Sequence, residues 1–196
     1  MKINEILNES HSSPLYHMMN YQKASNVFKN DTMIARWEHE IPNIGKVYGN
    51  SFTRNSRLKW LGRYIRITIN QEKLRYKNKI IPLDGQFCFF NHSHFSNGNI
   101  NDIRDRTFSA KKSDFEEELN EEFVISDIEN IHNIITDVYF FKGRNVYLNI
   151  HDIKKTKDLC ENYCKKWKIR FTIDDYYEKI INGIIKNDQF TYHFLT

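Results

Sequence analysis

A histidine, two hydroxyl groups and a glutamate stand in three short segments of this chain. His17 comes early, Ser51 and Thr53 follow at alternating positions, and Glu122 comes late, directly before the apolar run 123–125. Alternate residues of a strand share a face, so both hydroxyls are expected on one side, with Phe52 turned into the core. A carboxylate in such a group can stabilise positive charge that develops in a transition state.

Two further residues extend these segments. Tyr16 directly precedes His17, and Arg54 ends the second segment. A guanidinium group suits a diphosphate or another anionic partner. A purely structural interpretation is also open, in which Tyr16 and His17 are a half-buried pair on a strand and Arg54 is a solvated strand end.

Glutamates cluster just before the last segment, at positions 116, 117, 118, 121 and 122. Such a charge run is usually a solvated helix face. Glu122 differs from the others because an apolar run follows it at once. Glu121 is the neighbouring candidate, but the pleat of a strand would point it the opposite way.

In this order and spacing the three segments resemble the phage-encoded branch of the ADP-ribosyltransferase superfamily, over about residues 14–141. The resemblance implies an α+β fold, with an ADP-ribosyltransferase-like split two-sheet core, mostly antiparallel, and short peripheral helices. It also implies a cleft between the sheets that binds NAD as the substrate. The residues assigned to that cleft are catalytic Glu122 and NAD-binding Tyr16, His17, Ser51, Thr53 and Arg54.

The implied activity is mono-ADP-ribosyl transfer from NAD to a host macromolecule, with protein favoured over nucleic acid as the acceptor. The reaction is a substitution at C1′ of the nicotinamide ribose, through a transition state that resembles an oxocarbenium ion. Glu122 would hydrogen-bond the ribose 2′-hydroxyl and stabilise that cation, and His17 would contact the adenosine ribose. All four side chains, His17, Ser51, Thr53 and Glu122, are expected to converge on one cleft.

Two alternative functions stay open. The family often has Gly-Thr after its histidine, where this chain has Met18 and Met19, and Asn120 stands two places before Glu122 in place of an acid. These departures favour a catalytically inactive binding module of the same fold, for a virion or host factor. The basic balance and His92 and His94 suggest a nuclease or RNA-binding protein, but no aromatic-basic RNA motif supports that interpretation.

The first nine residues look separable from the rest. Residues 1–9 place an apolar stripe (Ile3, Ile6 and Leu7) on one helical face, and residues 10–14 contain helix breakers. The segment resembles capsid-targeting peptides of large tailed phages, which are cut after a triplet like the one ending at Glu9. We therefore expect a targeting peptide and linker at 1–13, a domain at 14–196, and a place in the host cytoplasm or the capsid interior. The alternative is a structural first helix.

Composition limits the remaining possibilities. The chain has 196 residues, 40% of them hydrophobic, and a net charge of +4, with acidic and basic residues interspersed. It therefore predicts one domain and no dominant nucleic-acid surface. The cysteines, at positions 88, 160 and 164, make no disulfide framework, and the last two share a helix face as buried thiols. We assign no metal site and no membrane span.

The elements that must position the candidate residues follow from periodicity and turn signals. Asn20 is expected to cap a helix. Strands are expected at 15–19, 49–53, 64–69, 79–81, 122–125, 137–141 and 168–173, and a closing strand at 190–195. Helices or helical turns are expected at 57–61, 71–75, 116–120, 127–134, 152–167 and 175–186, a loop at 36–48, and an irregular stretch at 84–110.

Overall fold

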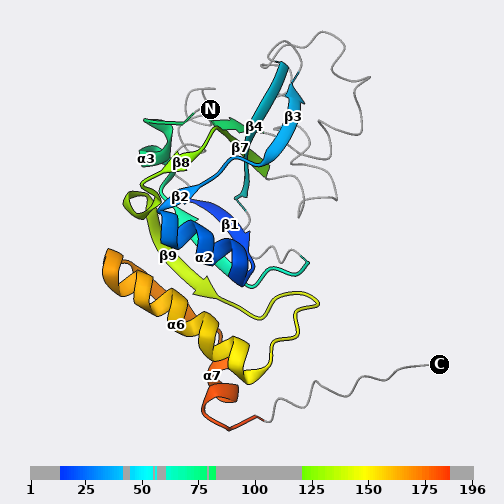
Figure 1. Cartoon of the computed structure of the whole chain (residues 1–196), viewed down its shortest axis with the longest axis vertical. Helices are drawn as coiled ribbons and strands as arrows, with labels where there is room; N and C mark the ends of the chain where they lie inside the picture. Colours follow the sequence, from blue (N-terminus) through cyan, green and yellow to red (C-terminus); the bar gives the residue numbers. More distant parts are fainter. Residues whose placement is uncertain are drawn as a thin grey trace, which may run out of the picture.

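The structure, a computed structural model, describes residues 14–41, 45–54, 56, 61–78, 80–82 and 121–185. Of residues 39–41, 81–82 and 121–122 it describes the backbone alone. Figure 1 shows the elements, which in chain order are β1 (Leu15–Met19), α2 (Tyr21–Asn30), β2 (Thr32–Met33), β3 (Trp37–Ile41), β4 (Gly45–Thr53), β5 (Ile65–Ile69), α3 (Gln71–Arg75), β6 (Ile80–Pro82), β7 (Glu121–Ile125), β8 (Ile128–Glu129), the 3₁₀ turn η2 (Ile131–Asn133), β9 (Ile135–Phe140), α6 (Ile150–Trp167), β10 (Arg170–Ile173) and α7 (Asp175–Ile181).

Most of the strands belong to one mixed sheet. Its order is β10-β9-β5-β1-β4-β7-β6, with β3 paired to β4, and β2 and β8 form a separate two-stranded sheet. Within the described residues only β9 and β10 run parallel. The predicted α+β class is confirmed, and β10 extends the sheet beyond residue 141, where the sequence-based core ended.

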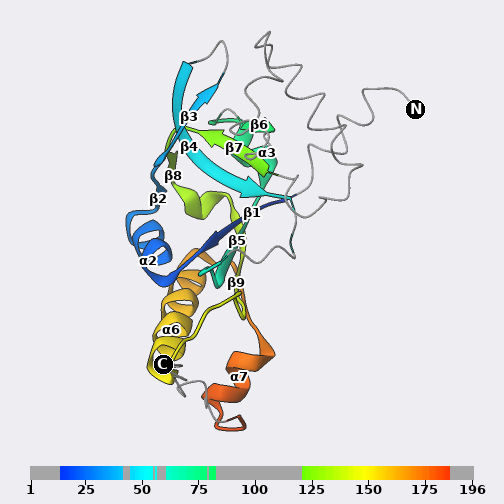
Figure 2. The same ribbon diagram turned by 90° about the vertical axis from the view of Figure 1, so that its right-hand side faces the viewer.

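The large sheet is divided at the junction of β1 and β4. β1 makes five register pairs with β5, and β4 makes five with β7. Between β1 and β4 the described ladder has a single pair, Tyr16 with Thr53. In Figure 2 the start of β1 meets the end of β4, and the two strands then diverge. The division of the core therefore lies within one sheet, at the junction of β1 and β4.

Both long helices cover the same side of the β1, β5 and β9 half (Figure 2). Each begins at an asparagine whose side chain accepts a backbone N–H: Asn20 from Lys23 at 2.9 Å and Asn149 from Asp152 at 2.8 Å. This is the usual N-cap arrangement, and the expected cap at Asn20 is confirmed.

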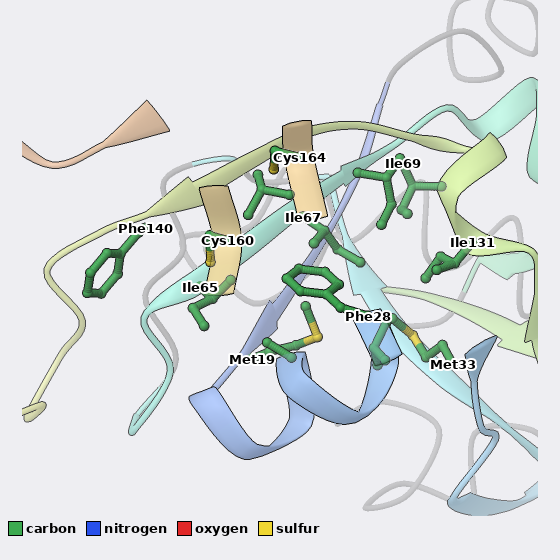
Figure 3. Packing of buried hydrophobic residues seen from close by; sticks show 14 of the residues in the cluster. Met19, Phe28, Met33, Ile65, Ile67, Ile69, Ile131, Phe140, Cys160 and Cys164 are labelled. Carbon is green, nitrogen blue, oxygen red and sulfur yellow. The ribbon is translucent and has the colours of Figure 1, made fainter. Parts of the chain in front are cut away.

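The core lies between these helices and the sheet. The ring of Phe28, on α2, lies 5.6 Å from that of Tyr163 and 5.4 Å from that of Trp167, both on α6. Figure 3 shows Phe28 beneath a row of isoleucines from β5. Cys160 and Cys164 are buried free thiols on one face of α6, as expected. Burial raises the pKa of the Cys164 thiol to about 12, so it behaves as a packing residue.

Three sequence-based predictions of secondary structure were wrong. Residues 36–48 are largely a hairpin of β3 and β4, whose exposed polar residues give no burial alternation. The helix expected at 127–134 is instead β8 and a 3₁₀ turn, because Asn130 takes a left-handed conformation with φ 52° that a helix cannot continue through. The last helix ends at Ile181 and not at 186.

Several predictions fall on residues outside the described ranges. These are the separable head at 1–13, the turns at 57–60 and 116–120, the stretch at 84–110 with Cys88, His92 and His94, Asn120, and the strand at 190–195. Among the described residues, no helix combines the length and the apolar character that crossing a membrane requires.

Candidate functional site at the split of the sheet

His17 lies at the junction where the sheet divides. Its side chain is 2% exposed, and its Nδ1 is 2.6 Å from the backbone carbonyl oxygen of Ser51. Its ring centroid lies 5.1 Å from that of Phe52. The side chain therefore bridges β1 and β4 at the point where the backbone ladder stops.

The His17 ring is neutral and its tautomer is set by this contact. Burial, followed by the positive charges of Lys23 and Arg63, lowers its pKa from 6.5 to about 3, although the bond to Ser51 acts in the opposite direction. A carbonyl oxygen only accepts, so Nδ1 carries the proton and donates it. Nε2 is then a lone-pair acceptor, and no described residue gives it a hydrogen bond.

The two hydroxyl residues of β4 lie on the opposite side from the His17 ring. Tyr16 is the register partner of Thr53, so His17 faces the side of Phe52. Ser51 and Thr53 are 9% and 2% exposed. Contrary to the shared cleft expected from the sequence, the structure brings His17 to the backbone of Ser51 and not to its hydroxyl. The reason is the register: because Tyr16 is paired with Thr53, Tyr16, Ser51 and Thr53 share one face of the sheet, and His17 and Phe52 share the other.

Tyr16 and Arg54 contact neighbouring elements. The guanidinium group of Arg66 lies 4.9 Å from the centroid of the Tyr16 ring. Arg54 donates from Nη1 to Oε1 of Gln71, at the start of α3, at 3.0 Å. The assignment of either residue to NAD binding stays a prediction.

Glu122 is placed by its backbone. It lies near the start of β7, as the register partner of Phe52, and Glu121 is the partner of Thr53. Gly49, on β4, allows the close pairing of β4 with β7. A Cβ on Gly49 would lie 2.3 Å from the carbonyl oxygen of Val124, so β4 and β7 could not approach as they do.

A pocket of about 520 Å³ opens beside the start of α2. Its lining includes Lys23 from α2, Arg36 before β3 and Arg63 before β5, together with the half-exposed ring of Trp37. None of the residues that line it in the described part of the chain is an aspartate or glutamate. Burial, then Arg63 and Arg36, lowers the pKa of Lys23 from 10.5 to about 8. The pocket is therefore strongly positive.

No family model matches the chain, and no curated protein matches it either. Three solved structures of DarT from Thermus sp. 2.9 are similar to it. The complex with carba-NAD+ has a TM-score of 0.49 at 9% identity, covering 85% of this chain and 97% of that one. The complex with NAD+ has a TM-score of 0.48 at 8% identity, with the same coverage. The complex with ADP-ribosylated ssDNA has a TM-score of 0.49 at 7% identity, covering 85% and 96%. At these values the likeness assigns no role to any residue of this chain.

Sequence reasoning missed the three cations of the pocket. Positions 23, 36 and 63 have no common spacing: Lys23 lies in the first turn of α2, Arg36 in the connection before β3 and Arg63 in the connection before β5. Only the folded chain brings Lys23, Arg36 and Arg63 together. Among the described residues, no group of three His, Cys, Asp or Glu side chains is arranged to hold a metal ion.

Proposed function

We propose that this protein is a mono-ADP-ribosyltransferase that uses NAD as the donor and a macromolecule as the acceptor. One observation carries the proposal. The segments around His17, Ser51 and Glu122 are 34 or more residues apart in sequence, yet they lie on β1, β4 and β7, three consecutive strands of the sheet. The split of the sheet lies within this group.

His17 would orient the donor. The bond from Nδ1 to the Ser51 carbonyl fixes the ring, and the lone pair on Nε2, which accepts no hydrogen bond from any described residue, can accept one from a ribose hydroxyl. A buried acceptor without a partner is costly, so a ligand hydroxyl that satisfies it gains free energy on binding.

Glu122 would act on the nicotinamide ribose. The bond from C1′ to the nicotinamide nitrogen breaks, and nicotinamide leaves with the bonding electron pair. A nucleophilic atom of the acceptor then bonds C1′ and releases its proton to solvent. A carboxylate near C1′ stabilises the cationic transition state between these events. The register supports this role, because Glu122 is opposite Phe52, whose ring contacts that of His17.

The alternative is a catalytically inactive module that binds a virion or host factor. The sequence arguments for it were the Met18-Met19 pair and Asn120 in place of an acid, and Asn120 lies outside the described residues. The side chains of Met18 and Met19 are 1% and 0% exposed, so they are buried in the protein and do not project into solvent beside His17. We therefore favour an active transferase over the inactive binding module. A host macromolecule as the acceptor, and a phage capsid as the place of packaging, remain part of the proposal.

The test is transfer of label from NAD labelled in its adenylate phosphate, with cell proteins and single-stranded DNA offered separately as acceptors. Glu122→Gln should lower transfer and NAD hydrolysis about a hundred- to a thousandfold, because the carboxylate acts as charge develops. Glu121→Gln is the matched control and should stay near wild type. Equal rates for wild type and Glu122→Gln would remove the catalytic role. A wild type that binds NAD but transfers nothing to either acceptor would favour the binding module.

A further inference from the structure

We propose that the pocket beside the start of α2 is a binding site for a phosphate-ester anion, a diphosphate above all, held by Lys23, Arg36 and Arg63. The identification of this anion with the diphosphate of NAD rests on the proposed function. The anion site itself rests on the charges and geometry of the pocket alone.

The charge balance of the pocket calls for an anion. Three cationic side chains line about 520 Å³, and the lining has no carboxylate within the described chain. In the part of the chain that the structure describes, none of the three forms an ion pair with an acid. By contrast, other basic side chains such as Arg170, Lys157 and Lys179 do pair with a carboxylate.

The three cations lie close enough to repel one another. Arg63 and Arg36 each lower the pKa of Lys23, and Lys23 and Arg63 both lower that of His17. Holding like charges together in a partly buried site is unfavourable unless an opposite charge joins them. A diphosphate, with charged oxygens on two phosphorus atoms, can contact several cations at once.

Local hydrogen bonds hold the cations where they are. Lys23 donates its backbone N–H to the capping side chain of Asn20, which fixes it in the first turn of α2. Arg63 directly precedes Tyr64, whose N–H donates to the carbonyl of Met19 at 3.0 Å.

The third cation is anchored in the same manner. Arg36 directly follows Ala35, whose N–H donates to Oδ1 of Asp127 at 2.6 Å. The backbone beside Arg36 and Arg63 is thus tied to another element, and that of Lys23 to the cap of its own helix, so the backbone around the pocket is formed before a ligand arrives.

The rest of the lining suits a nucleotide. Trp37 is 55% exposed at the pocket, and an exposed indole can stack on a base. Asn26 and Asn30 add amide donors and acceptors from the same face of α2. The volume lies within the range of ordinary small-molecule sites, roughly 300–1,000 Å³.

The first test is calorimetric titration of the full chain with two probes, inorganic diphosphate and ADP-ribose. Arg36→Gln and Arg63→Gln should each weaken the affinity about tenfold or more, because each removes a charged hydrogen-bond donor. Lys154→Gln is the matched control, since Lys154 is an exposed cation on α6 outside the pocket. Binding of ADP-ribose alone would point to a nucleotide ligand, and binding of both probes to any diphosphate. Absence of binding for both, or equal affinities in all variants, would overturn the site.

A second measurement uses the pH dependence of ADP-ribose binding, because its diphosphate stays fully ionised between pH 7 and 9. Lys23, beside Arg36, Arg63 and His17, has a pKa of about 8, so it loses its proton in this range. The affinity of wild type should fall as the pH rises, by up to about tenfold at pH 9. Lys23→Arg keeps the charge and should abolish this fall. An affinity that falls equally in both proteins would contradict the role of Lys23.

Failure here is distinguishable from failure of the proposed function. A chain that binds diphosphate through these cations but transfers no ADP-ribose keeps the anion site and loses the enzyme. A chain that transfers ADP-ribose with the same KM for NAD in wild type, Arg36→Gln and Arg63→Gln keeps the enzyme and loses the identification of the anion with the diphosphate of NAD.

Discussion

The two sides of strand β1 differ in how completely their polar groups are hydrogen-bonded and their apolar groups packed. Toward β5, all five residues of β1 are paired, and the apolar side chains Ile65, Ile67 and Ile69 of β5 are fully buried in the core beneath α2 and α6. Toward β4, the ladder has one described pair, and the buried Nε2 of His17 has no hydrogen-bond partner among the described residues. The cationic pocket beside α2 likewise has no acid in its described lining.

This difference separates the part of the molecule that provides stability from the part that is arranged for a ligand. Unpaired buried polar atoms and clustered like charges lower stability, so a fold retains them where they serve another purpose. The following predictions test that division.

The largest effect is expected in the packed half. Phe28→Ala should lower the free energy of unfolding by about 3–5 kcal/mol, because it removes a buried ring that contacts two aromatic residues of α6. Arg36→Gln, in the pocket, should change it by less than about 0.5 kcal/mol. Urea unfolding of the two variants and wild type measures both values. Similar losses for the two variants would mean that pocket and core are not separate in their contribution to stability.

A smaller change in folding stability is expected when the pH is lowered, because of His17. The pKa of His17 is lowered from 6.5 to about 3 in the folded protein, so between these values the unfolded chain binds more protons. Its contribution therefore lowers stability as the pH falls below about 6.5. The loss should be roughly 2 kcal/mol between pH 7 and pH 5.

His17→Asn supplies the comparison, because its amide nitrogen matches the position of Nδ1 and can still donate to the Ser51 carbonyl, but does not titrate. Denaturant unfolding at pH 7 and pH 5 should show a smaller acid loss in this variant than in wild type. If both proteins lose the same stability, the His17 ring is not held neutral by the fold.

Much of the fold could be predicted from residue patterns. The alternation in β5 and the buried run in β1 each identified a strand, and the Asn20 cap identified the start of α2. The β3–β4 hairpin was missed because its pairing is between exposed residues. Glu38, for example, is paired with Lys46 at 2.7 Å on the surface, so no apolar periodicity marks the strand.

The site was predictable only in its chain order. The three segments do lie on neighbouring strands, but their register decides which side chains share a face. One pair, Tyr16 with Thr53, sets His17 opposite Phe52 and away from the Ser51 hydroxyl, and no local pattern encodes that offset. The pocket cations come from one helix and two connections, which meet only in the folded chain.

The role of His17 is tested most directly by nitrogen NMR of its ring, with and without NAD. The Glu122→Gln variant is used so that the donor is not consumed, and His17→Gln identifies the signal among those of the eight histidines. Without NAD, Nδ1 should carry the proton and Nε2 should have the resonance of an unprotonated nitrogen. With NAD, the Nε2 resonance should move upfield as it accepts a ribose hydroxyl, while Nδ1 stays bonded to Ser51. A His17 ring whose nitrogen resonances do not move at saturating NAD would contradict the placement of the donor at the split of the sheet.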